Sequence, residues 1–335
     1  MDPSVPSAAM DLSILVPLRD EEGNVDPLIE AIGKAIPANL RAEILAVDDG
    51  STDATWARLQ AAAAKEPRLR TIRLRRNFGQ TAALAAGFDR ARGEIVVTLD
   101  GDLQDPPDEI PRLLEKIREG FDLVSAWRRH RKEGWLLRRL PSAAANALLR
   151  RISGLPLHDF GTTFKAYRRE VLSEVEMFGE SHRFIPVLAA QAGFRVAEIP
   201  VEAQPRRFGR SKYGLGRVYA VALDVLALAL FTRWLQKPLR AFGLPGVLSL
   251  AAGFLLGAAL AAWDFIDGPF TIREHPGLLL LSVFLMLTGI QILAIGLVAD
   301  LVARVYARTG RRPVYRVLEE SGPPPPAEPP RSGLL

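Results

Sequence analysis

Short apolar runs alternate with stretches of helical periodicity along the first 215 residues of the chain. Runs of aliphatic and β-branched residues predict buried strands, and the amphipathic segments between them predict helices. Such alternation is typical of an α/β domain with a mostly parallel sheet. Strands are predicted at residues 12–17, 44–47, 71–74, 95–99 and 122–126. One helix is predicted at 24–36, a second begins near residue 54, and a third ends near residue 91.

Two long segments near the carboxyl end have a different pattern. Residues 242–263 and 277–299 contain no charged side chain. Each has the roughly 20 residues needed to cross a hydrocarbon core, whereas buried core helices, the alternative, rarely run so long without charge. The link between them is acidic, and arginines and lysines flank the pair on both outer sides. The positive-inside rule therefore predicts a hairpin in the inner membrane, with both chain ends in the cytoplasm.

The pattern divides the chain into four parts. Residues 1–215 form the predicted cytosolic α/β domain, and 216–240 a juxtamembrane segment. Within that segment, residues 218–231 are apolar but short and interrupted by Asp224, which favours an interfacial helix over a buried domain helix. Residues 241–304 form the hairpin, and 305–335 a basic and proline-rich cytosolic tail that is expected to be partly disordered, from Ser321 onward.

Composition narrows the class of protein. The chain has 335 residues and no cysteine, which excludes disulfides and cysteine-based metal sites. Its net charge of +5 suggests anionic partners. A nucleic-acid binder would interleave basic and aromatic residues on one face. Here the basic residues cluster beside the apolar segments, so a membrane surface is the expected anionic partner, and nucleic acid is not.

The predicted strand at 95–99 ends in two carboxylates, Asp100 and Asp102, followed by Gln104 and by an Asp-Pro-Pro turn. Ligands of open α/β sheets bind at the carboxyl ends of the strands. Oxygen-rich side chains there suit a hard divalent cation, Mg²⁺ or Mn²⁺, which binds through one or two carboxylates and substrate phosphates. The predicted strand at 44–47 likewise ends in Asp48 and Asp49, which could also be simple turn residues.

These residues belong to an ordered series of motifs. The series runs VDDGSTD at 47–53, RNFGQ at 76–80, LDGDLQDPP at 99–107, FGRSKY at 208–213, KPLR at 237–240 and RRPVY at 311–315. Together they resemble the family 2 glycosyltransferases that charge polyprenyl phosphates, over roughly residues 11–318. The resemblance implies a GT-A fold, which is a Rossmann-like nucleotide-binding domain, and spans that can pack into a homo-tetramer.

The resemblance also implies roles for particular residues. Asp100, Asp102 and Asp159 match catalytic positions, and Asp102 and Gln104 match metal ligands. The expected donor-binding residues are Pro17, Glu21, Asp48, Asp49, Asp100 and Gln104. The expected acceptor-phosphate residues are Arg128, Arg138, Ser142, Arg206, Arg207 and Lys212. Arg19-Asp20 replaces a Tyr-Asn that is common in the family, so an aromatic that could stack on the donor's base is missing and the base stays open.

These expectations indicate an inverting, metal-dependent transfer of a sugar from a UDP- or GDP-linked donor to polyprenyl phosphate, with undecaprenyl phosphate favoured. One alternative is a processive polysaccharide synthase, but the chain lacks the Gln-x-x-Arg-Trp sequence with which such synthases bind a growing polymer. Another is a non-catalytic membrane scaffold, which would be expected to lose the metal carboxylates that this chain retains.

Overall fold

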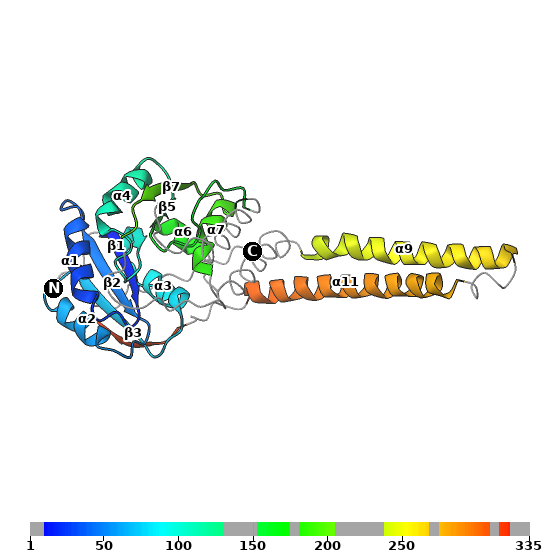
Figure 1. The fold of residues 1–335 in the computed structure, drawn as a ribbon, viewed down its shortest axis with the longest axis horizontal. Helices are drawn as coiled ribbons and strands as arrows, with labels where there is room; N and C mark the ends of the chain where they lie inside the picture. The colour runs from blue at the N-terminus through cyan, green and yellow to red at the C-terminus, as the bar shows by residue number, and fades with distance from the viewer. Residues whose placement is uncertain are drawn as a thin grey trace, which may run out of the picture. The chain divides into compact units, whose positions relative to one another are not determined.

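The fold was analysed in a computed structural model that describes residues 10–129, 150, 153–174, 181–204, 238–267, 275–308 and 315–321. The described chain divides into two compact units, one of them holding residues up to 222 and from 313 onward, the other residues 223–312. Figure 1 shows their helices and strands. The first unit contains β1 (Met10–Leu18), α1 (Val25–Ala35), β2 (Ala42–Asp48), α2 (Thr55–Ala63), β3 (Leu69–Leu74), α3 (Gln80–Phe88), β4 (Gly93–Thr98), η1 (Pro107–Glu109), α4 (Ile110–Arg118), β5 (Leu123–Arg128), β6 (Lys165–Arg168), α6 (Arg169–Glu174), η2 (Ser181–Arg183), α7 (Ile185–Gln191), β7 (Val196–Val201) and β8 (Val317–Glu320).

One eight-stranded sheet organises this unit, in the order β7-β5-β6-β4-β1-β2-β3-β8. The neighbours β3, β2, β1 and β4 are parallel, as are β5 and β7. β6 is antiparallel to β4 and β5, and β8 is antiparallel to β3. The prediction of an α/β domain with a mostly parallel sheet is confirmed, while β6, β7 and β8 were not anticipated.

Helices cover both faces of the sheet, which explains why its strands read as nearly continuous apolar runs. On β1, Ile14 and Val16 pack with apolar residues of α1, α2 and α4 on one face, whereas Leu15 packs with α3 on the other. A smaller core joins α6 and α7 to β5 and β6. The sheet is therefore the middle layer of three.

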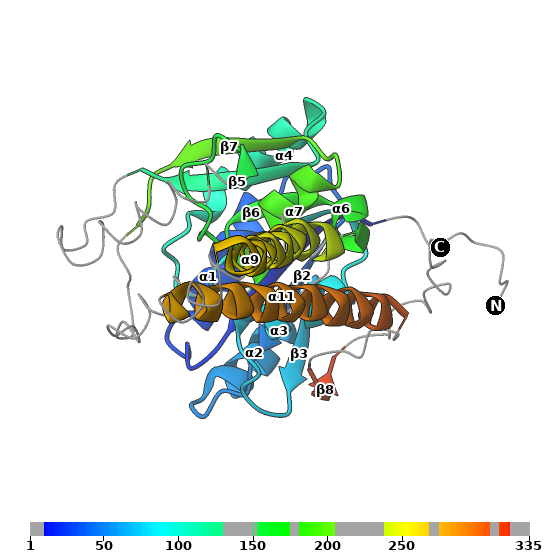
Figure 2. The same cartoon turned by 90° about the vertical axis from the view of Figure 1, so that its right-hand side faces the viewer.

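The edge strand β8 comes from the chain beyond the second long helix and lies beside β3 (Figure 2). The hydroxyl of Tyr315 donates to Asp89 Oδ2 at 2.7 Å and accepts from Arg90 Nη1 at 2.9 Å. Glu320 pairs with Arg90 at 2.8 Å and with Arg70 at 3.4 Å. The predicted tail at 305–335 thus contributes an ordered strand to the sheet, and Ser321, where disorder was expected to begin, hydrogen-bonds Thr71.

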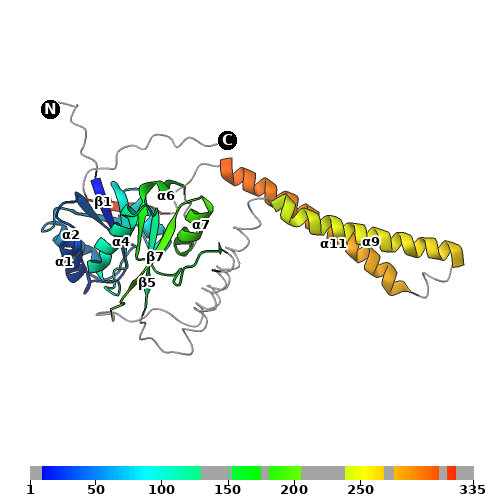
Figure 3. The same cartoon turned by 90° about the horizontal axis from the view of Figure 1, so that it is seen from above.

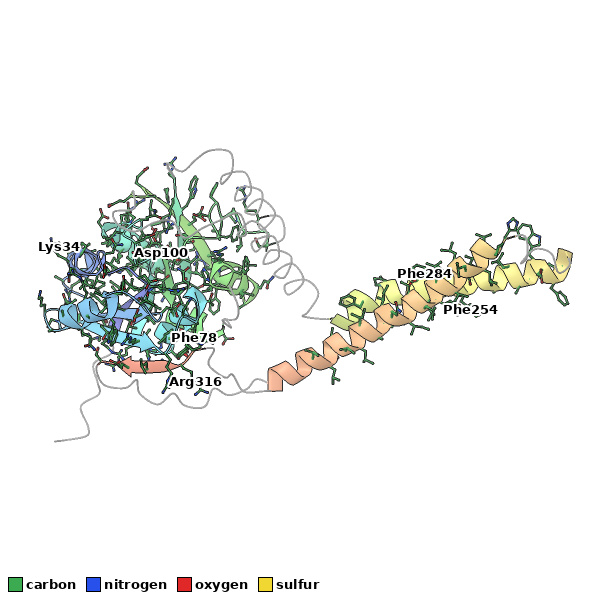
Figure 4. All side chains as sticks on the ribbon, turned by 60° about the horizontal axis from the view of Figure 1, so that its bottom comes forward. Lys34, Phe78, Asp100, Phe254, Phe284 and Arg316 are labelled. Carbon is green, nitrogen blue, oxygen red and sulfur yellow. The ribbon has the colours of Figure 1, made fainter. Side chains whose placement is uncertain are left out.

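The second unit is a helical hairpin of α9 (Pro238–Asp267) and α11 (Pro276–Arg308), which run side by side (Figure 3). Small residues allow the two backbones to approach, since a Cβ on Gly253 would lie 2.7 Å from the Ser282 carbonyl oxygen. Ser282 Oγ donates to the carbonyl of Gly253 at 2.9 Å. The outer surface is apolar, with Phe254 and Phe284 62% and 63% exposed (Figure 4).

Residues Phe242–Ile266 and Pro276–Val302 of the hairpin are long and apolar enough to cross a membrane. The exposure of their apolar side chains fits a lipid environment better than a water-facing surface. The helices extend beyond the predicted limits of 241–304: α9 begins at Pro238, and α11 continues to Arg308. The predicted interfacial helix at 218–231 lies outside the described residues.

Candidate functional site

The loops after β1, β2 and β4 meet at one edge of the sheet because these strands are parallel neighbours. The register pairs Leu18 with Asp48, and Leu15 with Thr98. The loop after β4 lies directly against the end of β1, since a Cβ on Gly101 would be 3.2 Å from the carbonyl oxygen of Pro17. This edge therefore gathers the predicted donor-binding residues of three strands.

The carboxylates of Asp48 and Asp49, at the end of β2, are buried and already engaged. Asp49 Oδ1 and Oδ2 accept the backbone N–H groups of Phe78 and Gly79 at 2.7 and 2.9 Å. Asp48 Oδ1 accepts the N–H of Ser51, while its Oδ2 lies 3.5 Å from Arg73 Nε and has no hydrogen-bond partner among the described residues. Burial raises the pKa of both carboxyls. Asp49 positions the loop before α3, and Asp48 keeps an oxygen without a hydrogen bond.

The loop after β1 is attached to the loop after β2. The N–H of Glu21 donates to Thr55 Oγ1 at 2.8 Å, and Glu21 Oε2 accepts from Asn24 Nδ2. Asp20 adopts a left-handed conformation with φ of 51°, which lets its side chain accept the N–H of Thr52. Glu21 is thereby held beside the Asp48 loop, where a ligand could contact both.

The turn after Asp100 presents Asp102 and Gln104. Leu103 has a positive φ of 59°, and Asp102 Oδ1 accepts the N–H of Gln104 at 3.1 Å. Asp102 is 7% exposed. No cluster of three or more His, Cys, Asp or Glu side chains that could hold a metal occurs in the described part of the chain. The carboxylate and amide oxygens of Asp102 and Gln104 suit a cation that completes its coordination with water and substrate phosphates.

Asp100, labelled in Figure 4, is the centre of a hydrogen-bond network in the first unit. Its Oδ1 accepts from Gln80 Nε2 at 2.8 Å, and its Oδ2 accepts from Arg128 Nη2 at 3.0 Å. Gln80 also donates to Thr163 Oγ1. Burial alone would raise the pKa of Asp100, but Arg128 and Thr163 hold it below its ordinary value. Asp100 is therefore an ionised group that is fixed by helix α3 and strand β5.

Arg128 is held mainly by Asp105, a carboxylate that sequence reasoning did not single out. Arg128 Nε and Nη2 donate to the two oxygens of Asp105, both at 2.7 Å. Asp105 is fully buried. Burial opposes the charge on Arg128, but Asp105 and Asp100 raise its pKa well above the ordinary value. Nη1 makes no hydrogen bond within the described residues, so Arg128 can still offer this group to an anion.

The predicted catalytic carboxylate Asp159 lies in the loop before β6. Its backbone N–H donates to Glu198 Oε1 at 3.1 Å, and its Oδ1 accepts the N–H of Gly161 at 3.0 Å. It is near enough to raise the pKa of both Arg128 and Lys165. Asp159 thus joins the cluster around Asp100.

The structure brings together nine of the predicted site residues and does not describe the other five. Those outside the described residues are Arg138, Ser142, Arg206, Arg207 and Lys212. Besides Asp105, sequence reasoning missed Gln80 and Lys165. Gln80 ends the RNFGQ motif, which could have marked it, whereas nothing in the hydrophobic pattern indicates that Lys165 is buried.

Comparisons with known proteins agree with this geometry. The model of the family described as glycosyl transferase family 2 matches residues 13–176. The chain is 40% identical over 317 residues to the dodecaprenyl-phosphate galacturonate synthase of Rhizobium johnstonii, which covers 93% of each chain. It is 35% identical over 317 residues to the undecaprenyl-phosphate 4-deoxy-4-formamido-L-arabinose transferase of Yersinia enterocolitica, which covers 93% of this chain and 94% of the relative.

Solved structures share the fold over about two thirds of the chain. Glucosyl-3-phosphoglycerate synthase from Mycobacterium tuberculosis, in complex with phosphoglyceric acid, matches with a TM-score of 0.53 and 23% identity, over 67% of this chain and 80% of that chain. The same enzyme with Mn²⁺ and UDP-glucose matches with a TM-score of 0.52 and 24% identity, over 67% and 79%. The prediction of a GT-A fold is confirmed by this likeness.

Proposed function

Because the chain belongs to glycosyl transferase family 2, we propose that this glycosyltransferase moves a sugar from a nucleoside diphosphate sugar to a polyprenyl phosphate at the cytoplasmic face of the inner membrane. Dodecaprenyl and undecaprenyl phosphates are named for its relatives, and undecaprenyl phosphate is the acceptor we favour. The products named for those relatives carry galacturonate and 4-deoxy-4-formamido-L-arabinose, and these sugars lead the list of donors to test.

The observation that carries this proposal is the turn at Asp102 and Gln104, held beside the Asp100–Arg128 pair at the carboxyl edge of the sheet. A sugar nucleotide leaves its diphosphate with added negative charge as the bond to the anomeric carbon breaks. Mg²⁺ or Mn²⁺ held by Asp102 and Gln104 would stabilise that charge when bound. Pro17, Glu21, Asp48 and Asp49, which lie along the same edge, are the proposed contacts of the nucleoside.

The acceptor needs positioning more than activation. A phosphate monoester is mostly ionised near pH 7 because its second pKa is about 6, so no strong general base is required. Arg128 can offer Nη1 to that phosphate while its other nitrogens hold Asp100 and Asp105. Arg138, Ser142, Arg206, Arg207 and Lys212 are the further proposed contacts of the phosphate. A single in-line displacement would invert the anomeric centre.

The connectivity of the chain supports placing both ends on one side of the membrane. The residues before and after the hairpin belong to the same compact unit, and β8 pairs with β3. A hairpin whose two ends join one folded unit crosses the membrane an even number of times. The basic residues outside the two spans favour the cytoplasm as that side.

The proposed reaction is tested by radiolabel transfer in membranes that contain the protein, undecaprenyl phosphate and Mg²⁺ or Mn²⁺. Labelled UDP-glucose, GDP-mannose and nucleotide-linked galacturonate and 4-formamido-arabinose are supplied in turn, and membranes with Asp102→Asn are the control. Label that enters the lipid phase with one donor, and only with intact Asp102, supports the proposal. Label in a polymer would favour a polysaccharide synthase, and no transfer from any donor would favour a scaffold.

The proposed topology has its own test, since the chain contains no cysteine of its own. Single cysteines are placed at Glu274, which lies in the sequence between the spans Phe242–Ile266 and Pro276–Val302, and at Glu319, in β8. A membrane-impermeant maleimide applied to intact cells should label only the cysteine at 274. Labelling at 319 would reverse the proposed orientation.

A further inference from the structure

Lys165 is a fully buried cation at the centre of the carboxylate cluster. It is the first residue of β6, the antiparallel strand between β4 and β5, and it pairs with Thr98 on β4 and Ser125 on β5. These two strands lead directly to Asp100 and Arg128. Lys165 therefore begins the strand that lies between the two strands leading to the groups that the proposed reaction uses.

The Lys165 ammonium is directed into the loop that carries Asp159. Nζ donates to the carbonyl oxygen of Thr162, three residues after Asp159. The next residue, Thr163, accepts from Gln80 through its hydroxyl, and its carbonyl accepts from the hydroxyl of Thr98. One end of the loop is thus fixed to β4, α3 and the lysine side chain.

The other end of this loop is held by a carboxylate from β7. Glu198 Oε1 accepts the backbone N–H groups of His158 at 2.8 Å and of Asp159 at 3.1 Å. Glu198 Oε2 also lies 2.7 Å from His158 Nδ1. Asp159 is therefore carried between two anchors, Glu198 and Lys165, that come from different strands.

The charge of Lys165 has a clear set of partners. Burial lowers the pKa of Lys165 to about 8, while Asp159 and Asp100 raise it, so the ammonium is retained at neutral pH. A buried charge is costly, and apolar residues of similar volume stabilise a fold at least as well. A lysine at this position is therefore better explained by the geometry that it imposes on the loop than by stability.

We propose that Lys165 is a positioning residue, which holds the Asp159 loop through the Thr162 carbonyl and places a second buried cation between Asp159 and Asp100. The inference rests on the proposed transfer reaction for its kinetic consequences, but not for its structural ones. It assigns no contact between Lys165 and either substrate.

The test compares Lys165→Met, which keeps an unbranched side chain as far as the ε-carbon and removes the ammonium group, with Lys165→Arg, which keeps a cationic donor. Arg168→Met is the matched control, since Arg168 lies on the same strand but pairs with Asp122 instead. We expect Lys165→Met to lower kcat about 100-fold, because small displacements of a reacting group cost about that much, with the donor KM changed less than about threefold. Lys165→Arg should stay within about tenfold of the parent kcat, and Arg168→Met within about twofold.

A double-mutant cycle separates positioning from general damage. If Lys165 acts through Asp159, adding Lys165→Met to Asp159→Asn should cost less than about threefold beyond Asp159→Asn alone. Additive losses, a donor KM that rises as much as kcat falls, or no rescue by arginine would each overturn the proposal. If Lys165→Met alone cannot be recovered as folded protein, the double variant, which removes both charges together, is measured in its place. The kcat of Lys165→Arg is then compared with that of the parent.

Amide hydrogen exchange gives a readout that does not depend on activity. The amides of Gly161 and Phe164 are hydrogen-bonded within the anchored loop, and the amide of Asp159 is hydrogen-bonded to Glu198 of β7. We expect peptides over residues 157–164 to exchange at least about tenfold faster in Lys165→Met than in Arg168→Met. Unchanged exchange in Lys165→Met would refute the positioning role even if no sugar transfer is found. If exchange is faster in Lys165→Met but the parent protein transfers no sugar, only the proposed reaction is refuted.

Discussion

Replacing Asp105 with asparagine removes one charge from a buried ion pair and leaves the shape of the side chain unchanged. Asp105 is fully buried, and the side chain of Arg128 is 9% exposed, so water cannot compensate the loss. Asparagine has one acceptor oxygen, and its amide N–H groups face the N–H groups of the guanidinium. Arg128 then retains Asp100, at 3.0 Å, as its remaining charged partner.

The size of the effect follows from that geometry. Removing one partner of a buried pair costs about 3–5 kcal/mol, and the contact that Arg128 keeps with Asp100 places this case near the lower end, at about 3 kcal/mol. In a domain of this size each kcal/mol lowers the midpoint of thermal unfolding by about 2–4 °C. We therefore expect the midpoint of Asp105→Asn to fall by about 6–12 °C.

The assay is thermal unfolding of the detergent-solubilised protein, followed by intrinsic tryptophan fluorescence. Asp108→Asn is the matched control, because it removes the same charge from an exposed side chain three residues later. A midpoint for Asp105→Asn equal to that of Asp108→Asn would refute this account of the pair.

Three further predictions concern other parts of the molecule. Asp102→Ala should abolish sugar transfer without changing the thermal midpoint, and activity equal to the parent in the radiolabel assay would exclude Asp102 as a metal ligand. Above pH about 8, kcat should fall as Lys165 loses its proton. Between pH about 8 and the unfolded pKa of about 10.5, the contribution of Lys165 to the free energy of unfolding should rise with pH, because the unfolded state binds more protons in this range. An equal fall of kcat in Lys165→Arg, measured in paired pH titrations, would contradict this prediction. Tyr315→Phe removes hydrogen bonds to Asp89 and Arg90. Their loss should cost about 1.5 kcal/mol of unfolding free energy and lower the thermal midpoint by about 3–6 °C. An unchanged melting curve would mean that these hydrogen bonds do not hold β8 in the sheet.

The sequence predicts those parts of the fold that depend on local patterns. The strands β1 to β5 are apolar runs that end in turn residues, and the hairpin helices are long stretches without charge. The carboxylates of the site could be found because they follow directly after such runs. In each case the signal lies in one continuous stretch of the sequence.

The missed features depend on contacts between distant parts of the chain. β8 has the sequence Val-Leu-Glu-Glu, in which Glu320 becomes favourable only beside Arg70 and Arg90, more than two hundred residues earlier. Lys165 reads as a surface residue until β4 and β5 enclose it. Local periodicity carries no information about either environment.

The charges of the site support the proposed dependence on a divalent cation. Four carboxylates and two cations form the described cluster around Asp100, with the imidazole of His182 beside it: Asp100, Asp102, Asp105 and Asp159 with Arg128 and Lys165. With that imidazole counted as neutral, their formal charges leave two negative charges unbalanced before any substrate binds. A nucleoside diphosphate adds more negative charge, which such a cluster would repel at close range. A divalent cation balances the excess negative charge of the protein and lets the diphosphate approach. Two independent arguments therefore indicate the same ion: the oxygen ligands offered by Asp102 and Gln104, and the net charge of the residues around them.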